Sequence, residues 1–319
     1  MLTAPDFEKK QIVFIFFNDG EKMAFQNDNL IVKSKDGKIK FQGTCYRLFL
    51  IYAVGNFSIT TVLLQKAKKF GFFIALMSAG FRLTDIIGAE KDGNTMLKRK
   101  QYAYDGLGIA KKITYNKIKN QQSLLKTIRH KNECTKEAII LLDAYASKTS
   151  EAGNLQELMS YEGLSSKLYF KNHFNNIRWN GRKPRLKKDI VNSVLDIGYT
   201  ILFAFVESIA ASYGFDLFCG VMHTQFYMRK SLICDLVEPF RPLIDRQIKN
   251  SINLGQIKEE DFAFVNLQYR LKYQKSPEYI RFLMKPLIEN KDEIFLYIQS
   301  YYRAFMKELP AESFPLYLI

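Results

Sequence analysis

The sequence predicts an α+β protein in which a β-rich N-terminal part precedes a helical remainder. Continuous β-branched and aromatic runs separated by turn signals occupy the first part, beginning with Gln11–Phe17. From about Met96 onward, apolar residues recur at helical spacing among Lys, Glu and Gln. The polar, glycine-bearing segment Gly88–Asn94 separates the two patterns. We therefore predict two domains, comprising residues 1–90 and 91–319.

Further strand signals follow Gln11–Phe17 within the predicted N-terminal domain. They lie at Leu30–Val32, Ile39–Gln42, Arg47–Val54 and Phe72–Met77. Arg47–Val54 is so apolar that we expect a small sheet to leave it partly exposed, as a surface for dimerisation. A helix is predicted from a cap at Ser58 to about Lys69. Its buried face would consist of Val62, Leu63 and Ala67.

The charge balance indicates a polyanionic partner. Lys and Arg number 47 against 32 acidic residues, which gives a net charge of +15. Such a surplus is typical of proteins that bind nucleic acid or an anionic membrane surface, although a generally basic proteome would also produce it. The apolar stretch Tyr199–Phe215 is interrupted by Glu207, and the cations do not follow one amphipathic helix. Nucleic acid is therefore the favoured partner, and we expect no membrane association.

The cysteines predict a cytoplasmic protein with reduced thiols. Cys45, Cys134, Cys219 and Cys234 form no CxxC pair, and the N-terminus lacks an apolar signal core. A zinc site could use Cys219, Cys234 and His223, but a fourth ligand is missing.

A basic segment between the helical stretches stands out from its surroundings. It contains Gly181 and Pro184 and no acidic residue, so we predict a mobile loop that contacts phosphates. A solvated linker remains the alternative. The cations of this basic loop are Arg178, Arg182, Lys183, Arg185, Lys187 and Lys188.

Two segments contain candidate metal-binding residues. His223 follows glycine and apolar neighbours, which suggests a packed corner. On a helix, Ser231, Asp235 and Glu238 would share one face, and two carboxylates on one face suit a divalent cation. A surface helix with two ordinary acids fits that segment equally well. Glu162 taken alone would more often be an acid near a helix N-terminus.

These residues fall into four ordered motifs that resemble the CRISPR-associated integrase family, the larger of the two universal adaptation proteins. The motifs span residues 158 to 245, and the main departure is that Ser165 and Ser166 replace the usual alanines. The length and basic charge would suit a type V or type II locus. The matching residues are Glu162-Gly163 with Tyr169-Phe170; Asp189, Val191-Asn192 and Gly198-Tyr199; Gly214-Phe215-Asp216 with His223; and Ser231-Leu232, Asp235-Leu236 and Glu238-Pro239-Phe240-Arg241-Pro242.

The resemblance implies an N-terminal β-sandwich-like domain and an all-helical catalytic domain. It also implies that Glu162, His223 and Glu238 bind Mg²⁺ or Mn²⁺, with Asp235 as an auxiliary acid. The implied activity is insertion of double-stranded prespacer DNA into the CRISPR array, by attack of a 3′-hydroxyl on a phosphodiester. A homodimer and a small partner protein would complete the assembly. A stand-alone metal-dependent nuclease acting on branched or single-stranded DNA is the alternative function.

Several cations are candidate phosphate contacts near such a metal. Arg229, Lys230 and Arg241 flank the last two motifs, and Lys167 follows Glu162 by about one helical turn. For each of them, an ordinary surface cation is the alternative interpretation.

Overall fold

The chain forms two compact units. The computed structural model describes residues 2–90, 93–177, 179–224 and 226–319. One unit consists of Met1–Thr95 with Glu207–Phe215, and the other of Met96–Val206 with Asp216–Ile319. The division near Thr95 lies shortly after the predicted boundary. The end of one long helix, which the prediction assigned to the second domain, belongs to the first unit.

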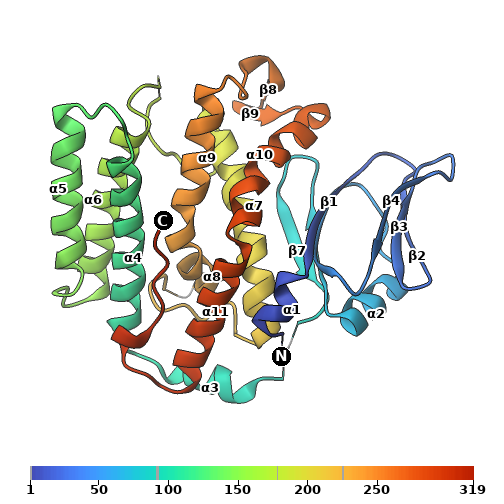
Figure 1. Cartoon of the computed structure of the whole chain (residues 1–319), viewed down its shortest axis with the longest axis horizontal. Helices are drawn as coiled ribbons and strands as arrows, with labels where there is room; N and C mark the ends of the chain where they lie inside the picture. Colours follow the sequence, from blue (N-terminus) through green and yellow to red (C-terminus); the bar gives the residue numbers. More distant parts are fainter. Residues whose placement is uncertain (1, 91–92, 178, 225) are drawn as a thin grey trace. The chain divides into compact units, whose positions relative to one another are not determined.

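The first unit contains two sheets (Figure 1). A four-stranded sheet has the order β1-β5-β6-β7, with β1, β5 and β6 parallel and β7 antiparallel to β6. An antiparallel sheet, β2-β3-β4, lies in the connection between the parallel strands β1 and β5. Apolar residues from both sheets form one core cluster. The strands are β1 (Gln11–Phe17), β2 (Lys22–Gln26), β3 (Asn29–Lys33), β4 (Ile39–Thr44), β5 (Leu48–Gly55), β6 (Phe73–Met77) and β7 (Leu83–Ile87).

The predicted strands are confirmed, whereas β2 and β7 were not predicted. Both are edge strands with mixed burial, so their sequences lack a continuous apolar run. The expectation that Arg47–Val54 would be partly exposed is wrong. Strand β5 pairs on both sides, and every residue from Leu48 to Val54 is buried. This strand therefore offers no surface for dimerisation.

The two helices of the N-terminal segment are α1 (Ala4–Glu8) and α2 (Thr61–Phe70). The cap of α2 is Thr60 rather than Ser58, because the Thr60 hydroxyl accepts a hydrogen bond from the Leu63 amide at 3.3 Å. Leu63 and Ala67 are buried as predicted. Val62 is 49% exposed, so its predicted burial is wrong.

The second unit is mostly helical rather than all-helical. Helices α4, α5 and α6 pack against one another, as Figure 1 shows. The difference from the prediction is a hairpin of β8 (Phe262–Val265) and β9 (Gln268–Leu271), whose short strands give little periodic signal. The remaining elements are α3 (Thr95–Ala103), α4 (Gly108–Lys126), α5 (Glu133–Lys148), α6 (Leu155–His173), α7 (Ile190–Tyr213), α8 (Ser231–Leu236), α9 (Arg241–Asn253), α10 (Ser276–Glu289) and α11 (Lys291–Met306), with 3-10 turns η1 (Glu238–Phe240), η2 (Glu259–Asp261), η3 (Tyr273–Lys275) and η4 (Ala311–Ser313).

Within the described ranges, α7 is the one helix with the length and hydropathy of a membrane span. Its most apolar window is 78% buried inside the structure. This burial is what the core helix of a globular protein shows.

Candidate active site

Helix α6 presents Glu162 on a face that points toward α4. The helix begins at Leu155, where the Asn154 side chain accepts a hydrogen bond from the Glu157 amide at 2.9 Å. One turn after Glu162, the Ser166 hydroxyl donates to Glu162 Oε1 at 2.8 Å. Glu162 is therefore a mid-helix carboxylate with a fixed orientation, not an acid at the helix N-terminus.

A polar face of α4 contacts the Glu162 carboxylate. This face of α4 was not predicted from the sequence. Lys117, Asn120 and Gln121 lie on the same side of α4 and are buried. The Lys117 ammonium forms ion pairs with Glu162 and with Glu238 Oε2, the latter at 2.6 Å. Gln121 Nε2 donates to Ser166 Oγ at 3.4 Å. Helix α4 thus contributes the cation that joins the two predicted ligand carboxylates.

The predicted single helix through Ser231, Asp235 and Glu238 is interrupted. Helix α8 ends at Leu236, and Glu238 begins the 3-10 turn η1, which contains Pro239. A proline disfavours helical geometry in the residue before it, which explains the break. Asn120 Nδ2 donates to the Pro239 carbonyl at 2.8 Å and so holds η1 against α4.

Two cations contact the Glu238 carboxylate. Lys117 binds Oε2, and Arg241 Nε lies 3.1 Å from Oε1. The Arg241 guanidinium also lies over the Tyr199 ring, 4.7 Å from its centroid. Arg241, which was predicted to hold phosphates, therefore has two partners within the protein.

The charges around Lys117 keep both glutamates ionised at neutral pH. Burial alone would raise the pKa of Glu162, but the Lys117 ammonium and the hydrogen bonds from Lys117 and Ser166 lower it to about 2. Burial would likewise raise the pKa of Glu238, but Arg241 and Lys117 lower it. The two carboxylates in turn raise the pKa of Lys117 against the effect of burial. Together these groups form a largely buried charge cluster, which consists of Lys117, Arg241, Glu162 and Glu238.

Asp235 and His223 form a second group. Asp235 is fully buried, and its carboxylate accepts hydrogen bonds from the backbone amides of Val221, Met222 and His223 at 2.6, 3.0 and 2.9 Å. His223 Nδ1 lies 2.7 Å from Asp235 Oδ1. The contact fixes the ring and leaves Nε2 as the nitrogen turned away from Asp235.

The tight turn before His223 requires a glycine at position 220. A Cβ at Gly220 would lie 2.7 Å from Asp235 Oδ2 and 2.8 Å from the backbone carbon of Ser231. The close approach of the Asp235 carboxylate therefore explains why a glycine stands at position 220.

The donor set fits a hard divalent cation in its chemistry. Glu162 and Glu238 supply ionised carboxylates to one location, and His223 supplies an oriented imidazole. No three His, Cys, Asp or Glu side chains in the described part of the chain already converge on one point. Instead, Lys117 lies between the two glutamates, while His223 pairs with Asp235. The same finding gives no support to a zinc site, and the four cysteines are free thiols.

The basic loop is more ordered than predicted. Arg182 donates to Asn192 Oδ1 at 3.0 Å and to Asp196 Oδ1 at 2.6 Å. Trp179 Nε1 donates to Asp189 Oδ1 at 3.1 Å, and the Lys187 carbonyl accepts from the Tyr269 amide at 2.9 Å. Mobility was inferred from Gly181, Pro184 and the charge, and these residues do not reveal the acceptors that the loop finds in α7.

The other predicted DNA contacts differ in exposure. Lys167, Arg185 and Lys188 are exposed, and Lys183 and Lys230 are half-buried. Arg229 donates to the Thr224 carbonyl and to Ser231 Oγ, so it braces the segment after His223. Arg178 lies outside the described residues. An exposed apolar segment, Phe226–Met228, accompanies Arg229 and Lys230, and sequence reasoning did not single it out.

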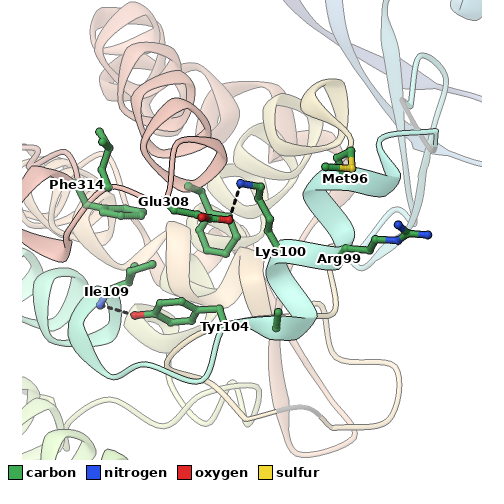
Figure 2. Close-up of a pocket in the computed structure, with 10 residues that line it drawn as sticks. Met96, Arg99, Lys100, Tyr104, Ile109, Glu308 and Phe314 are labelled. Atoms are coloured by element: carbon green, nitrogen blue, oxygen red, sulfur yellow. Dashed lines mark hydrogen bonds and ion pairs between the residues drawn. The ribbon is translucent and has the colours of Figure 1, made fainter.

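A separate cavity in the second unit contains none of these residues. It has a volume of about 600 Å³ and is largely apolar (Figure 2). Lys100 and Glu308 form an ion pair at its wall, and the Tyr104 hydroxyl accepts from the Ile109 amide. Its residues are Met96, Arg99, Lys100, Ala103, Tyr104, Ile109, Phe305, Glu308, Leu309 and Phe314.

Ionised carboxylates and an oriented imidazole in a strongly basic chain are typical of phosphoryl-transfer enzymes that act on nucleic acid. The sequence profile of the family described as CRISPR associated protein Cas1 matches residues 14–284. This chain therefore belongs to the Cas1 family, and it is an endonuclease and integrase of CRISPR adaptation.

Individual comparisons agree with the family. A CRISPR-associated endonuclease Cas1 of Thermodesulfovibrio yellowstonii is 27% identical over 257 residues, which cover 76% of this chain and 78% of the relative. A Cas1 protein from Thermotoga maritima shares the fold with a TM-score of 0.81 at 20% identity, over 93% of this chain and 97% of that one. A chain of a Cas6-RT-Cas1–Cas2 complex gives a TM-score of 0.82 at 22% identity. The match covers 97% of this chain and 36% of that longer one.

The geometry of Asp235 predicts a large loss of stability in Asp235→Ala. The substitution would leave three backbone amides without an acceptor, one of them on the buried residue Met222, so we expect the free energy of unfolding to fall by about 2–4 kcal/mol. Denaturant titration measures it. Asp143→Ala is the control, because it removes a half-exposed carboxylate and should cost at most about 1 kcal/mol. Equal stability of the two variants would contradict the structural role of Asp235.

Proposed function

We propose that Glu162, His223 and Glu238 together bind one divalent cation, Mg²⁺ or Mn²⁺, at which DNA strands are joined. The observation that supports this proposal is the meeting of two ionised carboxylates, the partly buried Glu162 and the buried Glu238, at one buried ammonium. A location that stabilises one cation between two carboxylates has the oxygen donors that a hard metal ion prefers.

In this proposal, some side chains bind the metal ion and others fix the orientation of those ligands. Glu162 and Glu238 present oxygen donors from α6 and η1, and Ser166 and Asn120 fix these two elements. Asp235 acts through His223, because its contact with Nδ1 turns Nε2 outward. We therefore assign Asp235 as a positioning residue rather than a metal ligand.

The proposed reaction is a phosphodiester exchange. The 3′-hydroxyl oxygen of a prespacer strand forms a bond to a phosphorus atom of the CRISPR repeat, and the bond from that phosphorus to the repeat's own 3′-oxygen breaks. The attacking hydroxyl loses its proton, and the leaving oxygen gains one. A bound divalent ion would lower the pKa of the attacking hydroxyl and neutralise charge on the nonbridging oxygens. No covalent enzyme intermediate is needed.

The proposed ligand set predicts loss of strand transfer in three single variants. Glu162→Ala, His223→Ala and Glu238→Ala should each lower strand transfer by at least about 100-fold, because each removes one of three donors. The measurement is gel analysis of a labelled prespacer joined to a repeat-containing plasmid in Mn²⁺.

The exposed residue Glu137 on α5 provides the matched control. Glu137→Ala should retain full strand transfer. Full activity of His223→Ala would exclude His223 as a ligand. Hydrolysis without any joined product in the native protein would favour the stand-alone nuclease.

We further propose that the basic loop binds duplex DNA through its outward cations. Lys183, Arg185 and Lys188 are the candidates, because Arg185 and Lys188 are exposed and Lys183 is only partly buried. Arg182 is bonded to Asn192 and Asp196, so it serves to shape the loop. The cations Arg229 and Lys230 directly follow the exposed Phe226–Met228 segment, and we propose them as further phosphate contacts on the segment after His223.

The loop proposal predicts a weaker dependence of DNA binding on salt when its charges are removed. Each phosphate contact contributes about −0.9 to the slope of log K against log salt. The triple variant Lys183→Gln, Arg185→Gln, Lys188→Gln should therefore have a slope less negative by about 2 to 3, whatever the DNA sequence. Fluorescence anisotropy measures the slope. A triple Gln variant of Lys98, Lys136 and Lys285 controls for net charge, and equal slopes in the two variants would exclude the loop.

We propose that the chain works as a homodimer in a complex with a small second protein, in the cytoplasm. Residues 1–90 would form the dimerisation domain, through exposed apolar side chains such as Ile39 and Tyr46 rather than through β5. The four free cysteines suit a reducing compartment. The Cas2-containing complex with a similar Cas1 fold supports a partner of this kind.

Assembly should govern integration, because both ends of a short duplex need active sites at a fixed separation. One subunit offers one Glu162–Glu238 site, and a symmetric pair offers two. We expect light scattering at micromolar concentration to show a dimer, and paired-end insertion to require the Cas2 partner. A monomer, or equal paired-end product with and without the partner, would contradict this arrangement.

A further inference from the structure

Lys117 is the one cation in the described residues that pairs with both proposed ligand carboxylates. Its ammonium contacts Glu162, and it lies 2.6 Å from Glu238 Oε2. The side chain is 9% exposed. An ammonium is rarely buried unless it has such partners. The position between the two carboxylates is the one that a divalent cation shared by them would take.

The backbone that carries Lys117 is firmly held. Asn120 Nδ2 donates to the carbonyls of Pro239 and Tyr317, both at 2.8 Å. Asn116 Oδ1 accepts from the Tyr317 amide at 2.8 Å. Helix α4 is therefore fixed to η1 and to the C-terminal segment, so that movement of the ammonium must come from the flexible four-carbon side chain.

The group of charges around Lys117 has no net charge, so binding of a metal ion requires that one of its cations leave. The positive charges of Lys117 and Arg241 balance the negative charges of Glu162 and Glu238. Adding a divalent ion to this largely buried group without removing a cation would leave two uncompensated positive charges. Uncompensated buried charge is strongly destabilising. Arg241 is additionally held over Tyr199, so Lys117 is the cation that can leave.

We propose that Lys117 is a resident counter-ion that occupies the metal position in the metal-free protein and is displaced when the metal ion binds. It is a positioning residue, because it holds Glu162 and Glu238 together and ionised before the metal arrives. This inference rests on the proposed metal site. It adds that Lys117 competes with the metal, so that the lysine weakens metal affinity while it stabilises the metal-free fold.

Lys117→Met tests the competition and retains most of the aliphatic volume of the side chain. We expect Mn²⁺ to bind Lys117→Met about tenfold more tightly than the native protein, because no ammonium must leave and the two carboxylates repel each other until the ion binds. Titration followed by the electron paramagnetic resonance signal of free Mn²⁺ measures the affinity. In EDTA the variant should melt at a lower temperature than the native protein, and Mn²⁺ should reverse that loss.

Lys119→Met is the matched control on the same helix. Lys119 pairs with Asp143 at 2.7 Å, away from both proposed ligands. Its replacement should leave Mn²⁺ affinity unchanged.

Glu238→Gln separates the proposed metal site from the proposed displacement of Lys117. If the native protein binds Mn²⁺ no better than Glu238→Gln, the proposed metal site fails. If Glu238→Gln abolishes binding but Lys117→Met binds Mn²⁺ equally or more weakly, the displacement of Lys117 is wrong.

A second measurement needs no variant and applies even if Lys117→Met fails to fold. Reductive methylation of the native protein, analysed by peptide mass spectrometry, reports the accessibility of each lysine amine. Lys117 should be poorly labelled in EDTA and several-fold better labelled in saturating Mn²⁺, while labelling of Lys119 stays constant. Equal labelling of Lys117 in the two conditions would overturn the proposal.

Discussion

The ion pairing of Lys117 with Glu162 and Glu238 is the interaction on which the architecture of the candidate site depends. These residues come from α4, α6 and η1, three elements far apart in the sequence. Two neighbouring carboxylates repel each other, and withdrawing them from solvent is costly, so a shared cation is needed to bring these elements together. Burial makes the cluster sensitive to the removal of any member. It also gives the protein a preformed place for a cation.

The second constraint is the Asp235 carboxylate. It collects three backbone amides and the His223 ring, and this explains why the chain turns so tightly at Gly220. Asp235 and Glu238 follow each other closely in sequence, yet they face different partners because the helix stops before Pro239. One short segment thus supplies a carboxylate to the charge cluster and a support to the imidazole. This division favours a supporting role for Asp235 over the auxiliary acid role that the sequence implied.

Much of the fold was accessible from the sequence because long apolar runs define the central strands and helices. Arg47–Val54, which contains most of the central strand β5, and the helical stretch after Met96 are examples, and the family motifs identified the family itself. The edge strands β2 and β7 and the short β8–β9 hairpin were missed, since partial burial leaves no period to detect. The exposure of β5 was misjudged because pairing on both sides is a tertiary property.

The residue types of the candidate site could be predicted from the sequence, but the ion pairs between its distant residues could not. Lys117 and Asn120 occupy the stripe between Ile113 and Leu124, where apolar residues are expected, and that irregularity was a usable signal. Nothing local could show that Lys117 would reach Glu162 and Glu238, which follow it far along the chain. Arg182 and Arg241 looked like free phosphate contacts for the same reason, because their partners Asp196 and Tyr199 are brought close only by folding.

We propose that the catalytic metal ion binds at the charge cluster. Anomalous diffraction from a crystal grown with Mn²⁺ locates the ion independently of activity. We expect one anomalous peak within coordination distance of Glu162, Glu238 and His223 Nε2, with the Lys117 ammonium no longer between the two carboxylates. A peak elsewhere in the chain, or a Lys117 ammonium still bound to both glutamates in crystals that contain the metal, would contradict it.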